Sequence, residues 1–224
     1  MQGSPGQSSN VQLGPKIFVA VAGNIGTGKT TLTNLLSEKY GWEPHYEVVA
    51  DNPYLADFYD NMTRWSFPIQ IFFLNTRFKA HKIINGSSNS AIQDRSIYED
   101  ANIFARNLYE SGCMEKRDYH NYLDIYQEMC QHLQPPDLLI YLRKSLPKLK
   151  SNISQRGRDY ETKISDTYLG SLNRYYDEWI ERYDIGKVLV VDSDSYDYVK
   201  RPEDFDKIGN MIFQELDQKE LFAK

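Results

Sequence analysis

The stretch that decides the fold covers residues 17–30 and reads Ile17-Phe18-Val19-Ala20-Val21-Ala22-Gly23-Asn24-Ile25-Gly26-Thr27-Gly28-Lys29-Thr30. Its six apolar residues predict a buried strand, and the pattern that follows predicts a helix over residues 29–40. The glycines between them let backbone N–H groups approach phosphate oxygens closely, and the N-terminal end of the helix attracts negative charge. This strand–turn–helix context is typical of a phosphate-binding loop.

The side chains of this loop predict its ligand. Lys29 is expected to reach the β- and γ-phosphates, and the Thr30 hydroxyl to ligate Mg²⁺. A purely structural glycine turn is the alternative, but two glycines followed by Lys and Thr at this spacing are rare by chance. We therefore expect a bound nucleoside triphosphate. The residues expected around its phosphates are Gly23, Asn24, Ile25, Gly26, Thr27, Gly28, Lys29, Thr30 and Thr31.

The composition fits one globular domain. The chain has 224 residues, of which 41% are hydrophobic and 25% charged. Its formal net charge of −5 argues against a nucleic-acid-binding surface, which is normally basic. Its two cysteines lack metal-ligand spacing, and no apolar stretch has the length of a membrane span. We expect a cytoplasmic protein with no membrane partner, a disordered tail over residues 1–15 and a single domain over 16–224.

Strands alternate with helices along the rest of the chain. Apolar runs predict further strands over residues 44–49, 90–94, 137–142 and 187–191. Helical spacing predicts helices over residues 54–61, 67–84, 97–111, 116–132, 146–155 and 202–218, and another that ends near residue 183. This alternation predicts an α/β fold of three layers, with a five-stranded parallel sheet flanked by helices. Ligands of such sheets bind at the carboxyl ends of the strands.

Charged residues follow two of the predicted strands at that edge. Asp94 is expected to hold Mg²⁺ together with Thr30, and Arg95 to neutralise a transferring phosphoryl group. A helix-capping aspartate and a surface arginine are the alternative. Glu47, near the end of the second strand, is expected to accept the proton of an attacking hydroxyl or to orient it, with an exposed carboxylate as the alternative. An alcohol is only weakly acidic, so we expect late proton removal, with positioning supplying most of the acceleration.

Two further groups of residues predict contacts with phosphate and base. Arg156-Gly157-Arg158 puts two guanidinium groups around a glycine between helices, which suits a mobile lid over about residues 156–165, although a solvated turn is the alternative. Gln70 and Arg77, seven residues apart, share a helix face. With Asp100 they offer the donors and acceptors that recognise a base edge, and Phe104 is expected to stack on the base, although an aromatic residue at helical spacing is usually part of the core.

Several motifs in register resemble those of the deoxynucleoside kinases, especially the bacterial deoxyadenosine/deoxyguanosine kinase branch. The similarity extends from about Lys16 to Glu215. Besides the phosphate loop, the motifs are Tyr46-Glu47, Asp51-Asn52-Pro53-Tyr54-Leu55, Trp65-Ser66-Phe67, Asp94-Arg95-Ser96-Ile97-Tyr98-Glu99-Asp100 and Arg156-Gly157-Arg158-Asp159-Tyr160-Glu161. The resemblance implies a P-loop kinase fold with an Arg-rich lid, and a homodimer packed through helices such as that at 116–132. It leaves feedback inhibition by a dNTP open.

The resemblance also implies a reaction and a role for each matching residue. The reaction is transfer of the γ-phosphoryl group of ATP to the 5′-hydroxyl of a 2′-deoxynucleoside in nucleotide salvage. Deoxyadenosine is the first expected substrate, followed by deoxyguanosine or deoxycytidine. The implied roles are Glu47 as catalytic base, Arg95 beside the 5′-hydroxyl, Lys29 at the phosphates, Asp94 on Mg²⁺, Tyr59 and Glu161 on the sugar 3′-hydroxyl, Gln70 as base reader, Arg77 and Asp100 as the charged pair behind the base, Phe104 as stacking aromatic, and Arg156 and Arg158 as lid arginines.

One departure and two alternatives accompany this hypothesis. Asn152 stands where several relatives carry another arginine, so phosphate stabilisation is expected to rely more on Arg156, Arg158 and Arg143. A nucleoside monophosphate kinase is one alternative, but it needs extra cationic groups for the acceptor's own phosphate. A non-catalytic nucleotide-binding subunit is the other, although such a subunit has no need of the combined catalytic residues.

Overall fold

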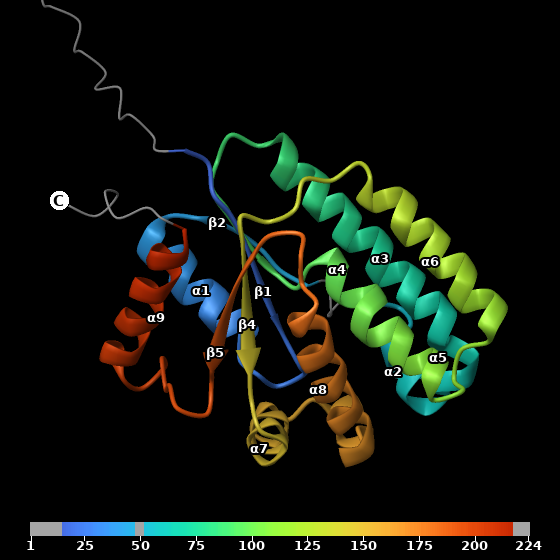
Figure 1. Ribbon diagram of the computed structural model, residues 1–224. Coiled ribbons are helices and arrows are strands. Elements are labelled where there is room, and N and C mark those ends of the chain that lie inside the picture. The colour runs from blue at the N-terminus through green and yellow to red at the C-terminus, as the bar shows by residue number, and fades with distance from the viewer. Residues whose placement is uncertain (1–14, 48–51, 217–224) are drawn as a thin grey trace, which may run out of the picture.

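The computed structural model describes residues 15–47 and 52–216. Within these residues a five-stranded parallel sheet forms the middle layer, with the strand order β2-β3-β1-β4-β5 (Figure 1). The strands are β1 (Phe18–Gly23), β2 (Glu43–His45), β3 (Ala91–Asp94), β4 (Leu138–Arg143) and β5 (Lys187–Asp192). The predicted three-layer α/β fold with a five-stranded parallel sheet is confirmed.

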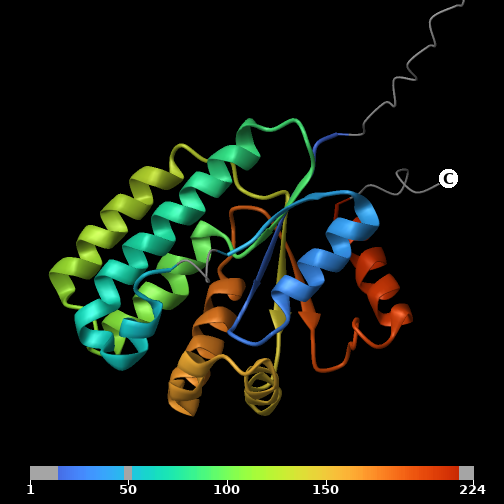
Figure 2. The ribbon, with the colours of Figure 1, turned by 180° about the vertical axis from the view of Figure 1, so that it is seen from behind.

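Helices cover both faces of the sheet. Helices α1 (Lys29–Tyr40) and α9 (Pro202–Glu215) pack together on one face, whereas α3 (Met62–Gly86) and α8 (Asp166–Glu181) cover the other, as Figures 1 and 2 show from opposite sides. The remaining helices are α2 (Leu55–Asp60), α4 (Ile97–Glu99), the π-helix η1 (Asp100–Ala105), α5 (Arg106–Glu110), α6 (Lys116–Cys130), α7 (Leu146–Arg156) and the 3₁₀-helix η2 (Asp159–Lys163).

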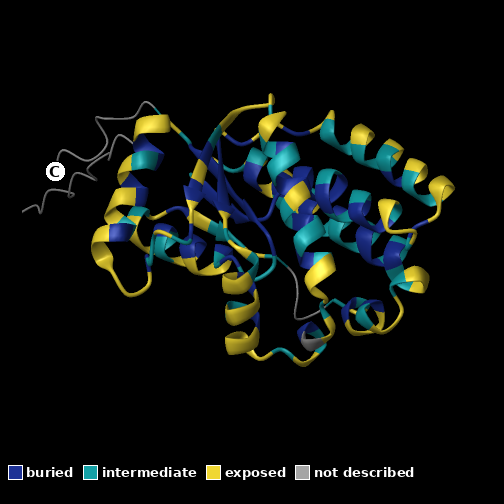
Figure 3. Ribbon diagram, turned by 60° about the horizontal axis from the view of Figure 1, so that its bottom comes forward, coloured by how far each residue is buried: buried dark blue, intermediate teal, exposed yellow. Residues whose placement is uncertain are grey.

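The alternation of side chains along β1 explains the two cores. Val19 and Val21 pack with α1 and α9, and Ala20 and Ala22 pack with the helices of the opposite face. All six residues of β1 are buried, which is the expected pattern for a parallel strand covered on both sides. Figure 3 shows this sheet as a buried centre between more exposed helices. None of the helices in the described part of the chain has the length and hydropathy that crossing a membrane requires.

Three predicted elements differ from the structure, and the simplest difference is that α3 begins at Met62, five residues before the predicted start at residue 67. The second strand ends at His45, because its partner β3 ends one residue beyond the Gln93 that pairs with His45. Glu47 therefore follows the strand, and the predicted strand residues Val48 and Val49 lie outside the described residues. The helix predicted over 97–111 has a π-helical middle, η1, which is a feature frequent at functional sites. The predicted tail falls almost entirely in residues 1–14, outside the described part.

The sheet brings the predicted site residues to one edge. β1 is the central strand, and its carboxyl end leads into the phosphate-binding loop. In the parallel register of β1 and β3, Val21 pairs with Asp94, so β3 ends two residues before β1, at the same edge of the sheet. Asp94 and Arg95 are thereby held beside the loop, at the edge where ligands of parallel sheets bind.

Candidate active site

The phosphate-binding loop requires glycine at its turns. Gly26 and Gly28 have φ values of 83° and 100°, a region that residues with a Cβ rarely adopt. Space is restricted as well, since a Cβ on Gly26 would lie 2.9 Å from Ile153 Cγ1 in helix α7. The loop therefore has a backbone conformation that requires glycine, and it lies in close contact with the helix that leads to the predicted lid.

Two polar residues stabilise the shape of the loop, Asn24 through contacts with α8 and Thr27 through a contact within the loop. The Asn24 side chain donates to Leu169 O at 2.9 Å and to Asn173 Oδ1 at 2.7 Å, both on α8. The Thr27 hydroxyl donates to Asn24 O at 3.0 Å. We predicted Asn24 and Thr27 among the phosphate-binding residues, but their side chains hold the shape of the loop and do not line the cavity.

Lys29 is buried at the base of this loop. Its Nζ donates to Asn24 O at 2.9 Å. Burial and the nearby Arg95 cation lower the pKa of Lys29 to about 8, while the carboxylates of Asp94, Glu47 and Glu99 act in the opposite direction. A bound phosphate would place negative charge beside the Lys29 ammonium and so stabilise its charged form.

Thr30 and Asp94 fit the predicted magnesium site. The Thr30 hydroxyl donates to Asp94 Oδ2. Within the described residues, Asp94 Oδ1 is a buried oxygen with no hydrogen-bond partner. Carboxylate and hydroxyl oxygens beside a phosphate-binding loop suit Mg²⁺, which keeps several waters and uses few protein ligands. The predicted alternative, an aspartate that caps the next helix, does not hold, because Ser96 is the N-cap residue of α4.

Glu47 lies between two arginines. Arg77 NH2 donates to Glu47 Oε1, and Arg95 Nε donates to Glu47 Oε2 at 3.2 Å. Burial alone would raise the pKa of Glu47, but the cations of Arg95, Arg77 and Lys29 lower it to about 2. Glu47 is thus an ionised hydrogen-bond acceptor at neutral pH and an intrinsically weak base.

Arg95 is buried in a strained backbone conformation. It is the one residue other than glycine with positive φ in the described chain, at 67°. Its NH1 donates to Tyr176 OH at 2.8 Å and to Glu99 Oε2 at 3.2 Å, and its guanidinium lies 4.7 Å from the centre of the Phe104 ring. A surface ion pair, which was the alternative for Arg95, is therefore wrong.

The predicted base-reading residues lie together. Gln70 and Arg77, both on α3, are buried, and Arg77 NH1 forms an ion pair with Asp100 Oδ1 at the start of η1. Gln70 Oε1 is buried and has no hydrogen-bond partner among the described residues. The Arg77 guanidinium also lies 4.8 Å from the centre of the Phe73 ring. This end of the site combines a fixed ion pair with one free amide oxygen.

The predicted lid and sugar-binding residues are in contact. Arg156, at the end of α7, donates from Nε to Glu161 Oε2 at 3.0 Å and from NH2 to Glu161 Oε1, so the pair is bidentate. Arg158 NH1 lies 3.5 Å from Glu161 Oε1. Tyr59 on α2 stacks on Tyr160 of η2, with ring centroids 5.9 Å apart. The segment after α7 thus closes one side of the site.

One cavity of about 270 Å³ joins these groups. Its walls include apolar side chains from α2 and α3, which suit a flat organic ring. Gly23, Asn24, Thr27, Gly28 and Thr31 do not line it. The predicted residues that line the cavity are Ile25, Gly26, Lys29, Thr30, Glu47, Tyr59, Gln70, Arg77, Asp94, Arg95, Asp100, Phe104, Arg156, Arg158 and Glu161.

The sequence departure at Asn152 has a structural counterpart. Asn152 Nδ2 donates to Gly26 O at 2.7 Å and so connects α7 to the phosphate-binding loop. Arg143, which we expected to compensate for the missing arginine, donates to Asp177 Oδ2 at 3.0 Å on α8 and does not line the cavity. The contacts of Arg143 in this structure do not support this compensation, which stays a prediction.

Several residues at the site were not predicted, among them Glu99, Tyr160, Tyr168 and Tyr176. Glu99 had a recognisable signal, since Ser96 and Glu99 have the spacing of a capping box, but that signal indicates only a helix start. Tyr176 contacts Arg95, and Tyr160 and Tyr168 line the cavity. Nothing in the sequence distinguishes Tyr168 and Tyr176 from the other tyrosines of the chain, and Tyr160 lies in the motif at residues 156–161 without a predicted role of its own.

The fold and the site together define a nucleotide-binding kinase, with a phosphate-binding loop and a base-sized pocket at one sheet edge. Residues 19–216 match the model of the deoxynucleoside kinase family. The chain belongs to the deoxynucleoside kinase family. The expectation of an ATP-dependent phosphotransferase that acts on a deoxynucleoside is confirmed at this level.

Named relatives support this assignment. The chain is 38% identical over 197 residues to the deoxyadenosine/deoxycytidine kinase of Bacillus subtilis (strain 168), covering 87% of this chain and 91% of the relative. It is 36% identical to the deoxyguanosine kinase of the same organism, over 86% and 94% of the two chains. Among solved structures, the deoxyadenosine kinase from M. mycoides with dCMP and dCDP has a TM-score of 0.80 at 32% identity, covering 88% of this chain and all of the other. The same kinase with bound dATP has a TM-score of 0.78.

Proposed function

We propose that this kinase transfers the γ-phosphoryl group of ATP to the 5′-hydroxyl of deoxyadenosine in preference to other deoxynucleosides, with deoxyguanosine or deoxycytidine next. The observation that carries the base preference is the buried, unpartnered oxygen of Gln70 in the described part of the site. The amino group of adenine supplies the donor that this oxygen lacks, and the Gln70 amide N–H groups match a ring nitrogen acceptor of the same base. The relative named as a deoxyadenosine/deoxycytidine kinase supports this choice.

The chemistry follows from the charges around the acceptor hydroxyl. Glu47, ionised because its pKa is about 2, accepts a hydrogen bond from the 5′-hydroxyl and orients its oxygen. A carboxylate of such low basicity takes the proton only late, once the bond to phosphorus has largely formed. Arg95, on the other side of Glu47, donates to the transferring phosphoryl oxygens.

The phosphate-binding loop acts on the donor. Its backbone N–H groups and Lys29 hold the β- and γ-phosphates, and Thr30 and Asp94 are the residues that would hold Mg²⁺. The chemistry that Mg²⁺ would supply at these residues is neutralisation of the negative charge on the phosphates. Arg158, whose side chain is 40% exposed at the cavity, reaches the phosphates from the segment 156–165, which acts as a lid.

The sugar and the base are held by separate walls. Tyr59 and Glu161 bind the 3′-hydroxyl, and Phe104 stacks on the base, whose edge faces Gln70, Arg77 and Asp100. Supporting this proposal, all six side chains line the same cavity. The absence of an additional cluster of cations among the residues that line this cavity favours an uncharged nucleoside over a nucleoside monophosphate as acceptor.

A substrate panel tests the proposal. Each natural deoxynucleoside and ribonucleoside, together with dAMP, is offered with labelled ATP, and kcat/KM is measured. We expect the highest kcat/KM for deoxyadenosine and no turnover of dAMP. A higher value for deoxyguanosine or deoxycytidine would contradict the base preference, and efficient turnover of dAMP would favour the monophosphate kinase alternative. Gln70→Leu should lower kcat/KM for deoxyadenosine about tenfold or more, because the base loses its hydrogen-bond partner.

Three further properties extend the proposal. We propose that a dNTP product inhibits the enzyme, since a kinase of this family has been solved with bound dATP. Inhibition by dATP that competes with deoxyadenosine would support this. A homodimer and a cytoplasmic location stay predictions. Sedimentation or light scattering of the purified protein distinguishes a dimer of about 52 kDa, twice the 26.1 kDa of the chain, from a monomer.

A further inference from the structure

The guanidinium of Arg95 lies between two carboxylates that differ in surroundings. One is Glu47, which lines the cavity and also binds Arg77. The other is Glu99, which is fully buried and does not line the cavity. Arg95 Nε donates to the first at 3.2 Å, and Arg95 NH1 donates to the second at 3.2 Å. Arg95 therefore has a second carboxylate partner, Glu99, that a substrate in the cavity does not contact.

Glu99 is fixed by hydrogen bonds from three donors besides Arg95, one of them at the N-cap of its own helix α4. Tyr176 OH on α8 donates to Glu99 Oε2 at 2.6 Å, and the backbone N–H of Ser96 donates to Glu99 Oε1 at 3.0 Å. The backbone N–H of Gly23, the first residue of the phosphate-binding loop, donates to Glu99 Oε2 at 3.4 Å. These contacts leave the carboxylate no freedom to move with the substrate.

Tyr176 completes this arrangement from α8. Its hydroxyl accepts from Arg95 NH1 at 2.8 Å while donating to Glu99. Its ring is fully buried and stacks on Tyr141 of β4, with centroids 5.5 Å apart and an interplanar angle of 13°. Ring packing and two hydrogen bonds thus hold the hydroxyl at one point beside the guanidinium.

We propose that Glu99 and Tyr176 are positioning residues, which hold Arg95 toward the transferring phosphoryl group while Glu47 turns to the 5′-hydroxyl of the substrate. This inference rests on the role of Arg95 proposed above. When the 5′-hydroxyl of the substrate donates a hydrogen bond to Glu47, the hydrogen bond between Glu47 and Arg95 becomes weaker. If Glu47 were the only partner of Arg95, the guanidinium would then lose its orientation. The Glu99–Tyr176 pair keeps the guanidinium in one orientation before and during transfer, which is the preorganisation that electrostatic stabilisation requires.

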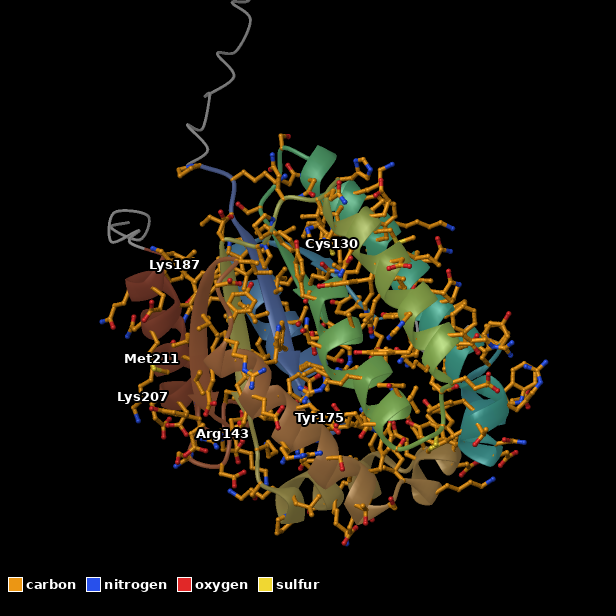
Figure 4. All side chains as sticks on the ribbon, turned by 45° about the vertical axis from the view of Figure 1, so that its right-hand side comes forward. Cys130, Arg143, Tyr175, Lys187, Lys207 and Met211 are labelled. Carbon is orange, nitrogen blue, oxygen red and sulfur yellow. The ribbon has the colours of Figure 1, made fainter. Side chains whose placement is uncertain are left out.

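The same helix offers a matched control. Tyr175, next to Tyr176 and labelled in Figure 4, is 2% exposed. Its hydroxyl donates to Glu110 Oε2 at 2.6 Å and accepts from Arg174 NH2 at 2.9 Å. Tyr175 and Tyr176 therefore make the same pair of hydrogen bonds, to one carboxylate and one arginine, but Tyr175 makes them away from the cavity.

The test compares Tyr176→Phe with Tyr175→Phe in the full-length protein. We expect Tyr176→Phe to lower kcat about tenfold, with the KM values for deoxyadenosine and ATP changed by less than about twofold, because Arg95 acts in the transition state. We expect Tyr175→Phe to keep kcat within about twofold of wild type, with a similar change in Tm. Equal kcat values for the two variants, or a loss confined to KM, would overturn the inference.

A double-mutant test shows whether Tyr176 acts through Arg95. In an Arg95→Ala background, Tyr176→Phe should cause no further loss of kcat, since the group that it positions is gone. Glu99→Gln keeps the capping box but removes the buried charge, and it should lower kcat without raising either KM. Additive losses in the double variant would overturn the inference. Wild-type protein without turnover of any deoxynucleoside would contradict the proposed function itself, and the inference with it.

Discussion

The two ends of the cavity are built in different ways. At the phosphate end, the loop that holds the phosphates is one continuous stretch, residues 23–30, to which Asp94, Arg95 and Arg158 add side chains, and backbone N–H groups of the loop supply much of the binding. At the nucleoside end, the groups are side chains from α2, α3, η1 and η2, which are far apart in sequence. A site made of backbone depends on local conformation, and a site made of side chains depends on the packing of whole helices. Substitutions at the two ends should therefore fail in different ways.

The contrast also extends to charge. The phosphate end holds a buried lysine, Lys29, whose pKa falls to about 8 because burial and the Arg95 cation outweigh the nearby carboxylates. At the other end, Arg77 is paired with both Asp100 and Glu47 before any ligand arrives. The phosphate end is thus suited to bind an anion. At the nucleoside end the charges are already paired, which suits an uncharged nucleoside. Glu47 stands between the two ends and is the residue whose loss should have the largest effect.

Glu47→Gln should lower kcat by about 10²–10⁴-fold, because the amide neither orients the hydroxyl as an anion nor takes its proton. The affinity for ATP should change little, since the phosphate-binding loop is untouched. Steady-state kinetics and direct titration with ATP measure the two quantities. Glu43→Gln, at an exposed carboxylate of β2, is the control and should keep wild-type turnover. Near-normal turnover of Glu47→Gln would remove Glu47 from the mechanism.

Arg158→Ala should lower kcat about 100-fold while leaving the Kd for deoxyadenosine within about twofold, because the arginine serves the phosphates. Arg156→Ala is the informative comparison. It removes the bidentate partner of Glu161, so it should also raise the Kd for deoxyadenosine. Single-turnover kinetics and nucleoside titration measure the two effects. If Arg158→Ala changed only the affinity for nucleoside, the assignment of this arginine to the lid would be wrong.

Most of the fold follows from local signals in the sequence. The run of apolar residues before Gly23 predicted β1, and the spacing of Ile71, Leu74 and Phe78 predicted the long helix α3. The errors arise where contacts between distant segments determine the local structure. The length of β2 depends on where its partner β3 ends, and the π-helical turn of η1 is not visible in an apolar periodicity.

The residues of the candidate site likewise differ in how well local sequence predicts them. The phosphate end was predictable from the residues alone, because its chemistry lies in one motif of fixed spacing. The roles of Tyr59, Gln70 and Glu161 were predicted mainly through the resemblance to a family, and they stay predictions. Tyr176 was missed, because its contact with Arg95 exists only once α8 packs on the sheet.

Substitutions of Gly26, in the phosphate-binding loop, and Gly41, at the end of α1, distinguish the effect of an unfavourable φ from the effect of a steric clash. Gly26 and Gly41 have similar φ values, 83° and 69°, but a Cβ on Gly41 meets nothing within 4 Å. Gly41→Ala should cost about 1 kcal/mol of stability and leave the KM for ATP unchanged. Gly26→Ala should cost more, because its Cβ meets Ile153 and Leu149, and should raise the KM for ATP about tenfold. Equal effects of the two variants on that KM would contradict the close fit between the loop and α7.

The smallest expected effect is a difference in pH dependence between the two ends. The pKa of Lys29 falls from 10.5 to about 8 in the free protein, so Lys29 loses its charge as pH rises through 8. A bound triphosphate favours the charged form, so binding of ATP above that pH takes up a proton and its Kd should rise, by at most about tenfold per pH unit.

The binding of deoxyadenosine should stay constant over the same range. The pKa of Glu47 is about 2, and burial raises the pKa of Tyr59 well above 10, so neither group titrates between pH 7 and 9. Calorimetric titration of both ligands at several pH values measures the difference. Lys29→Arg, whose guanidinium stays charged, should abolish the pH dependence for ATP. Two outcomes would contradict the proposed difference in charge between the two ends of the cavity. One is a Kd for ATP that does not change with pH, and the other is a parallel rise in Kd for both ligands.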